Sequence, residues 1–235
     1  LYKFSDPKKL KKVRFISKGV WEKGILPDDW FNSKICTLIQ NDSAIALRSE
    51  TDRSFELFHI ETAAKTSARD VSDREDAFYF QTDLFLAKNV KWYFLLNNQL
   101  PEYLQADLEK AMQTLMRLGI GGERTTGCGA LTEFKIVDFN FDMDESVKDK
   151  HSQVSLSLSI PKDDNLSKND LYQIIKRGGR FLTKRKSLPM IQMLQEGAIL
   201  NNDFAGRIVE LNNEPIVLRY GLNFPIPLHQ NFSNF

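Results

Sequence analysis

Five of the chain's twelve glycines lie within the eleven positions from Gly119 to Gly129, in the sequence GIGGERTTGCG. Glycine adopts positive φ values without a steric penalty and lets a ligand come within hydrogen-bonding distance of backbone N–H groups. Successive N–H groups in such a loop form a nest for anions, and phosphate is the anion we expect here. An arginine and two hydroxyls at the centre of the loop suit contacts to a phosphodiester. The candidate phosphate-contacting residues are Gly119, Gly121, Gly122, Arg124, Thr125, Thr126, Gly127 and Gly129.

Two known phosphate-binding motifs do not fit this loop. A P-loop would need Lys and then Ser or Thr directly after Gly127, but Cys and Gly follow it. A dinucleotide fingerprint that starts at Gly119 would need glycine in place of Arg124, and it would precede a helix instead of following one. A purely structural explanation, in which the glycine ends the preceding helix, suits Gly119 alone. For the loop as a whole we favour ligand binding.

The net charge of +1 conceals two clusters of basic residues. No acidic residue lies between Asp170 and Glu196. The basic residues of this block are Lys176, Arg177, Arg180, Lys184, Arg185 and Lys186, and those of a second run are Lys8, Lys9, Lys11, Lys12 and Arg14. Such runs usually form a solvated face. Gly178 and Gly179 inside the first block favour a surface that a phosphate backbone approaches closely.

Composition is that of an ordinary soluble protein. With 235 residues and 42% apolar content, the chain can form one large domain or two small ones, each with a core. No apolar run has the length of a membrane span, and no signal peptide is recognisable. The two cysteines, far apart and without metal-ligand companions, indicate a cytoplasmic protein without disulfides. The chain begins with Leu1, so we expect its natural beginning to be missing.

The first part of the chain combines short strands with one clear helix. Residues 102–118 carry apolar side chains at three- and four-residue steps, which predicts an amphipathic helix directly before the glycine loop. Residues 62–76 are polar and predict an exposed loop or hairpin. The segments in which we expect strands are residues 13–16, 55–60, 78–80, 91–96 and 131–141. A strand, a helix and a further strand make half of a ferredoxin-like module.

A second module is predicted after an acidic boundary at residues 142–150. In residues 154–160, Val, Leu and Ile alternate with three serines, which predicts a strand with an apolar core face and a serine face toward solvent. Further strands are expected at residues 171–175, 190–194, 207–211 and 216–220, the last two forming a hairpin. The tail that contains Pro225 and Pro227 is expected to be irregular. The sequence thus predicts an α+β protein.

Three segments together resemble a known family. They are GIGGERTTGCG, KRGGRFLTKRKSLPMIQMLQEGAIL and RIVELNNEPIVLRYGLNF. They are similar to the Cas5-like members of the RAMP superfamily, and most closely to the subunit of type III-A CRISPR (Csm) interference complexes that binds the crRNA 5′ tag. The resemblance implies two ferredoxin-like (RRM-like) modules, with the glycine-rich loop between them and a hairpin inserted in the first. Residues 1–145 would form the first module, incomplete at its N-terminus, and residues 146–235 the second.

The same resemblance implies a set of RNA contacts and partners. The glycine loop would bind RNA, as would a tag-binding hairpin and a loop of the second module. The residues that these two elements would add are Lys65, Arg69, Arg74, Lys176, Arg177, Gly178, Gly179, Arg180, Lys184 and Arg185. The implied partners are crRNA, the large palm-polymerase subunit and the backbone subunits of the complex. No cofactor, metal or membrane is expected.

No catalytic site is assigned from the sequence. His59, His151 and His229 have no evident acid or base partner, and acidic residues near position 142 fit a solvated boundary better than a metal site. We therefore expect recognition: N–H groups, hydroxyls and arginines hold a single-stranded tag by its phosphates, while exposed aromatic side chains stack on its splayed bases. Stacking is the weaker half of this expectation, because the aromatic residues at 78–80, 92 and 93 fit a core better than a stacking platform. The alternatives are a repeat-RNA endoribonuclease of the same superfamily and a protein-interaction scaffold without RNA contact.

Overall fold

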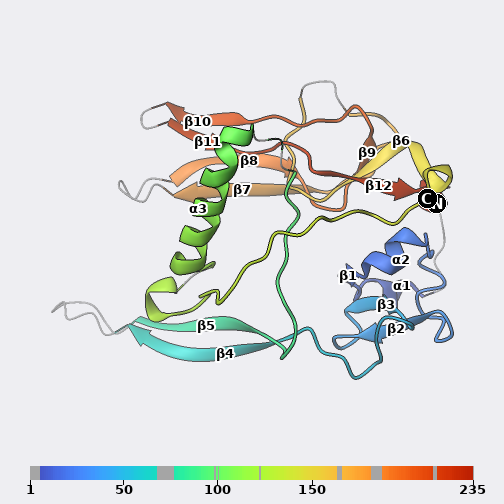
Figure 1. The fold of residues 1–235 in the computed structure, drawn as a ribbon, viewed down its shortest axis with the longest axis horizontal. Helices are drawn as coiled ribbons and strands as arrows, with labels where there is room; N and C mark the ends of the chain where they lie inside the picture. Colours follow the sequence, from blue (N-terminus) through green and yellow to red (C-terminus); the bar gives the residue numbers. More distant parts are fainter. Residues whose placement is uncertain are drawn as a thin grey trace. The chain divides into compact units, whose positions relative to one another are not determined.

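A computed structural model describes residues 6–67, 77–97, 99, 101–121, 123–162, 166–180, 187–213 and 216–234 (Figure 1). The chain divides into two compact units. One unit combines Leu1–Trp92 with Phe141–Phe235, and the other is Tyr93–Asn140. Small sheets, mostly antiparallel, and a few helices confirm the predicted α+β class. The two ferredoxin-like modules and their boundary at residue 145 stay predictions. No helix in the described part of the chain is long and apolar enough to cross a membrane.

The N-terminal part of the larger unit is built around a short sheet. Its strands are β1 (Phe15–Ile16), β2 (Cys36–Ile39) and β3 (Ala44–Leu47), with β3 in the middle, parallel to β1 and antiparallel to β2. Two short helices, α1 (Pro7–Leu10) and α2 (Lys18–Glu22), accompany it. The Ser17 hydroxyl accepts a hydrogen bond from the Val20 amide and so starts α2. Val20 then packs with Ile45 in a buried cluster.

A long hairpin follows, formed by β4 (Phe58–Ser67) and β5 (Ala77–Leu86). Its strands confirm the hairpin alternative for residues 62–67, and residues 68–76 lie outside the described part. Thr62 and Thr82 face each other across the ladder, their hydroxyl oxygens 3.1 Å apart. The prediction of a core position is wrong for the aromatic residues at the start of β5 and for the two that follow the hairpin, because their side chains are exposed. They are Phe78, Tyr79, Phe80, Trp92 and Tyr93.

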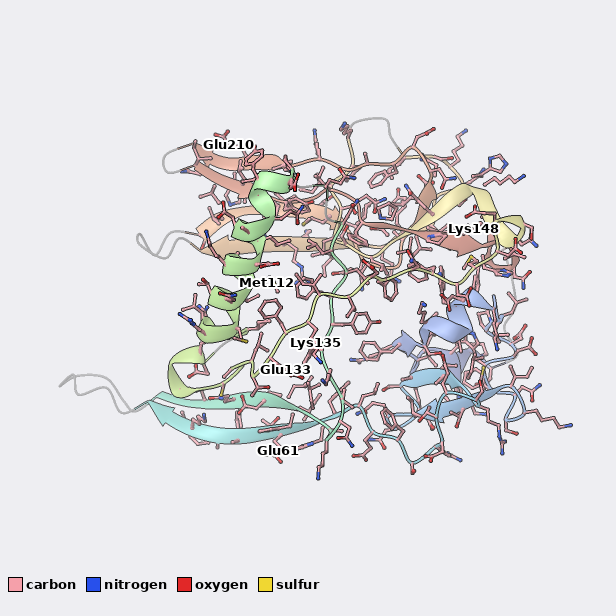
Figure 2. All side chains as sticks on the ribbon, in the orientation of Figure 1. Glu61, Met112, Glu133, Lys135, Lys148 and Glu210 are labelled. Carbon is pink, nitrogen blue, oxygen red and sulfur yellow. The ribbon has the colours of Figure 1, made fainter. Side chains whose placement is uncertain are left out.

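The smaller unit contains α3 (Glu102–Leu118), whose bounds match the predicted helix (Figure 1). Met112 lies midway along it (Figure 2). A turn of 3-10 helix, η1 (Arg124–Thr126), lies within the glycine loop. The strands predicted at residues 91–96 and 131–141 are wrong, since the described residues of both segments form no ladder. Strand-forming residue types form a strand only where another strand pairs with them, and these two segments join no ladder among the described residues.

The C-terminal part of the larger unit has three small sheets. Antiparallel β12 (Pro225–His229), β6 (Lys148–Ser155) and β9 (Ile199–Asn201) form one sheet with β6 in the middle. Two ribbons form the others: β7 (Ile174–Arg180) with β8 (Ser187–Leu194), and β10 (Val209–Asn213) with β11 (Ile216–Arg219) (Figure 1). The β10–β11 pairing confirms the predicted hairpin. Short 3-10 turns, η2 (Glu145–Val147) and η3 (Gln230–Asn234), flank the first sheet in sequence.

The proline-containing tail is a strand, contrary to the sequence prediction. β12 lies at an edge of its sheet and, among the described residues, pairs only with β6. An edge strand tolerates proline because its missing N–H faces away from the ladder. The Pro227 carbonyl accepts a hydrogen bond of 3.0 Å from the Trp21 indole. Trp21 also stacks on Phe232 and packs against the buried cluster that contains Phe232 and Leu228.

Two of the three serines in residues 154–160 are buried, which overturns their predicted exposure. Ser155 and Ser159 have 0% exposed surface, whereas Leu156 is 42% exposed. The two serine hydroxyl oxygens lie 3.1 Å apart, and Ser155 also donates to the Ser157 carbonyl at 2.8 Å. Small hydroxyls can be buried when each finds a hydrogen-bond partner. The strand itself also begins earlier than predicted, at Lys148 (Figure 2).

Acidification below the ordinary histidine pKa is expected to destabilise the larger unit through His229. Burial lowers the pKa of His229 below 6.5, and its Nδ1 accepts a hydrogen bond from the Asn231 amide at 3.1 Å. Below about pH 6.5, the unfolded chain therefore binds a proton at this histidine more readily than the folded chain does. The free energy of unfolding keeps its full value above about pH 6.5 and falls below it. Urea unfolding at about pH 7.5 and about pH 5.5 measures this effect. His229→Gln should lose that part of the pH dependence; an unchanged profile would contradict the assignment.

Candidate nucleic-acid interface

Helix α3 leads the chain directly into the glycine loop, and Gly119 ends the helix. Its amide donates to the Leu115 carbonyl at 2.8 Å, and its φ is +77°. A Cβ at this position would lie 2.9 Å from the Gly129 carbonyl oxygen. These contacts support the structural explanation for Gly119, because a left-handed, sterically crowded helix end requires glycine.

The loop is closed by a contact between its two ends. The Ile120 amide donates to the Gly129 carbonyl at 2.9 Å, and Gly129 has φ +72°. A Cβ on Gly129 would lie 1.8 Å from the Ile120 carbonyl oxygen, closer than any real contact. Gly129 is therefore needed for the shape of the loop, whatever the loop binds.

Several amides at the centre of the loop already bond to the loop itself. The N–H groups of Thr126 and Cys128 donate to the Glu123 carbonyl, and that of Gly127 donates to the Arg124 carbonyl. The Thr126 hydroxyl also donates to the Glu123 carbonyl, at 2.7 Å. These groups hold the 3-10 turn in place. The amides available to an anion are consequently fewer than the glycine count suggests.

The outer side of the loop is open. Gly121 (φ +95°) and Gly127 (φ +88°) have no heavy atom within 4 Å of the place where a Cβ would stand. Neither glycine has a packing reason, but each leaves room for a ligand beside the backbone. The Arg124 side chain is exposed, and no acidic residue in the described segments forms an ion pair with it. Gly122 and the Thr125 side chain lie outside the described part.

The second basic block lies partly on β7. Lys176 and Arg177 are exposed and adjacent on the strand, so they point to opposite faces of the β7–β8 ribbon. Gly178 leaves room for a neighbour: a Cβ there would lie 2.4 Å from the Met190 sulfur. Its carbonyl accepts a 2.8 Å hydrogen bond from Arg219 of β11. Packing thus accounts for Gly178, and no local pattern in the sequence indicates its partner Arg219.

The remaining predicted RNA contacts are placed only in part. Lys65 is half-buried on β4, opposite Tyr79 of β5. Gly179 lies in β7, where a Cβ would be 3.1 Å from Leu188. The side chain of Arg180 lies outside the described part, as do the residues Arg69, Arg74, Lys184 and Arg185. RNA binding by any of these residues stays a prediction.

The three histidines have different surroundings. His59 is exposed, stacks on Phe85 with ring centroids 5.0 Å apart, and has Nε2 3.3 Å from Glu61 Oε1. This pair was not recognised from the sequence, although a two-residue separation on one strand places both side chains on the same face. His151 is exposed and His229 is buried. No group of three or more His, Cys, Asp or Glu within the described residues could hold a metal ion.

Comparison with known proteins agrees with these motifs. Residues 148–228, which include the basic strand β7, match the family of CRISPR Csm4 C-terminal domains. The chain is also 28% identical over 245 residues to the "CRISPR system Cms protein Csm4" of Methanocaldococcus jannaschii. That alignment covers 88% of this chain and 64% of the relative, so the chain spans somewhat less than two thirds of the relative's length. The two matches confirm the resemblance to the Cas5-like RAMP subunits of the type III-A Csm system.

Proposed function

We propose that this chain is a noncatalytic RNA-binding subunit of a type III-A Csm ribonucleoprotein complex in antiviral defence. It caps the crRNA at its 5′ repeat-derived tag and docks the large palm-polymerase subunit, and it works in the cytoplasm. The observation that carries the proposal is the open backbone at Gly121 and Gly127 beside the exposed Arg124. The likeness to Csm4 supports it.

Recognition of the RNA backbone follows from the chemistry of the loop. Gly121 and Gly127 let a phosphate approach the backbone, and the Arg124 guanidinium provides a charged fork that matches phosphate geometry. Lys176 and Arg177 add one exposed cation on each face of the β7–β8 ribbon. Such contacts fix the position and direction of a strand without reading its bases.

Docking of a protein partner is supported by exposed apolar side chains on the β10–β11 ribbon. Ile216, Leu218 and Tyr220 of this region are 70%, 59% and 65% exposed. Their alternation on β11 and just beyond it places them on one face. The opposite face carries Arg219, which is tied to β7. A clustered apolar face of this kind marks a protein-interaction surface.

The proposed function is tested with a labelled RNA that carries a repeat-derived 5′ tag. We expect the triple variant Arg124→Ala, Lys176→Ala, Arg177→Ala to bind it at least about tenfold more weakly. The dependence of log K on log salt should flatten by about 2, because each phosphate of a single strand that the protein no longer neutralises reduces the slope by about 0.7. Fluorescence anisotropy at several salt concentrations measures both quantities.

A matched control removes the same charge elsewhere. Lys23, Lys88 and Lys150 are exposed, and the variant that replaces all three with alanine should keep more of the affinity. If both triple variants lose affinity equally, the binding is general electrostatics and the assigned site is wrong. The RNA should stay intact throughout. Cleavage that disappears in His59→Ala would instead favour the endoribonuclease alternative.

A further inference from the structure

The N-terminal part of the larger unit contains a cavity of about 340 Å³ beside β2. Trp30, Phe31 and Leu38 supply its apolar lining. Arg48, Asp52 and Arg53 supply charged groups. A volume of this size lies within the range of small-ligand sites, which combine apolar walls with a few polar groups. None of these residues belongs to the glycine loop or to β7.

The aromatic lining is held in place by the core. The Trp30 indole donates to the Ile25 carbonyl at 2.8 Å, and both Trp30 and Phe31 pack against the buried cluster around Ile45. Rings fixed in this way lose little conformational freedom when a planar group stacks on them. The lining is therefore preorganised for a flat ligand.

Three cationic side chains lie at the cavity or its margin. The Lys9 ammonium lies 5.8 Å from the centroid of the Phe31 ring and forms an exposed ion pair with the Asp6 carboxylate at 3.1 Å, which holds it only weakly. Arg48 uses one N–H group to hold the Ser33 carbonyl at 2.7 Å, which leaves other donors of its guanidinium available. Arg53 lies 3.8 Å from the Asp42 carboxylate and is largely exposed, so it is weakly held. These groups can pair with phosphates on either side of a bound planar group.

Asp52 distinguishes a nucleotide from an acidic peptide as the ligand. Hydrogen bonds from the hydroxyl and the amide of Ser54 lower the pKa of Asp52, so this carboxylate is ionised at neutral pH. An ionised carboxylate repels an acidic peptide. It accepts hydrogen bonds from N–H groups on the Watson–Crick edge of a nucleobase, a donor that 4-thiouridine also has at N3.

We propose that this cavity binds one nucleotide of a single-stranded RNA. The base stacks on the aromatic lining and donates to Asp52, while the flanking phosphates contact Arg48, Arg53 and Lys9. This is a second RNA contact, separate from the one through the glycine loop. It holds whether or not that loop binds a 5′ tag.

Photocrosslinking of the full chain to a 4-thiouridine-containing RNA decamer tests the proposal. We expect a crosslink within residues 30–53, located by peptide mass mapping. Arg48→Ala with Arg53→Ala should weaken decamer binding about tenfold and flatten its salt dependence by about 1.4. Thr51→Trp fills the cavity with no change of charge, so it should remove the crosslink and leave the salt dependence unchanged. Lys23→Ala with Lys88→Ala is the charge-matched control.

Each outcome decides the assignment. A crosslink that survives in the Arg124, Lys176 and Arg177 triple variant shows that the cavity acts independently of the glycine loop. A crosslink outside residues 30–53, or one that persists in Thr51→Trp, overturns the inference. Loss of the crosslink at a lower concentration of a Glu-rich decapeptide than of unlabelled decamer would assign the cavity to a protein partner instead. Thermal melting verifies that every variant is folded.

Discussion

Replacement of Gly129 by alanine is expected to open the glycine loop and to abolish RNA binding through it. The added Cβ would lie 1.8 Å from the Ile120 carbonyl oxygen, and φ at this position is +72°. Backbone cannot move aside as the end of a flexible side chain does, so the hydrogen bond that closes the loop must break. Overpacking and left-handed backbone strain together disfavour the closed loop by about 2–5 kcal/mol. Hydrogen exchange at the Ile120 amide reports the opening directly.

Gly127→Ala is the matched comparison for this prediction. Gly127 has a similar positive φ of +88°, but nothing lies within 4 Å of its Cβ position. Its substitution therefore adds only backbone strain of about 1–2 kcal/mol, and Gly127→Asn should cost less because asparagine tolerates this conformation. If Gly129→Ala left both the Ile120 protection and the RNA affinity unchanged, the loop closure would be unimportant for binding. If Gly127→Ala lost affinity with the loop still closed, a ligand must approach the backbone there.

Local patterns in the sequence predicted the parts of the fold that local interactions determine. The helix at Glu102–Leu118 was predicted with its observed bounds, because its apolar stripe and the glycine after it are encoded within a few turns. The closing pair of the loop was not predicted. Gly119 and Gly129 meet in space although ten positions separate them. Glycine identity alone therefore did not distinguish the positions that shape the loop from the open positions Gly121 and Gly127.

Strands were predicted less well because a strand depends on its neighbours. Residues 91–96 and 131–141 have strand-forming composition but form no ladder among the described residues. β12 has two prolines, which predict irregular structure, yet it forms an edge strand against β6. In the candidate site, Lys176 and Arg177 of β7 are exposed, as the basic pattern predicts. The sequence predicts that a ligand approaches the backbone at Gly178. In the structure, Met190 and Arg219 pack around this glycine instead.

Ser155→Asp is expected to destabilise the larger unit by about 3–5 kcal/mol, the second large effect that the structure predicts. The sequence pattern placed Ser155 on a solvent face, where an aspartate would be tolerated. The structure buries it completely, with its amide bonded to the Ala198 carbonyl at 2.9 Å and its hydroxyl beside that of Ser159. A carboxylate there would lose its hydration and find no cation among these contacts. Urea unfolding of the full chain measures the loss.

Leu156→Asp is the matched comparison for Ser155→Asp, because Leu156 is the next residue along the chain and its side chain is exposed. Leu156 is 42% exposed, so its carboxylate would remain hydrated and the loss of stability should be at most about 1 kcal/mol. The opposite order, with Leu156→Asp the more damaging variant, would contradict the observed burial of Ser155 and exposure of Leu156. Should Ser155→Asp fail to fold, Ser155→Ala keeps the comparison measurable. It removes one buried hydroxyl and leaves Ser159 its contact with the Ser157 carbonyl at 3.2 Å, so a loss of only about 1 kcal/mol is expected.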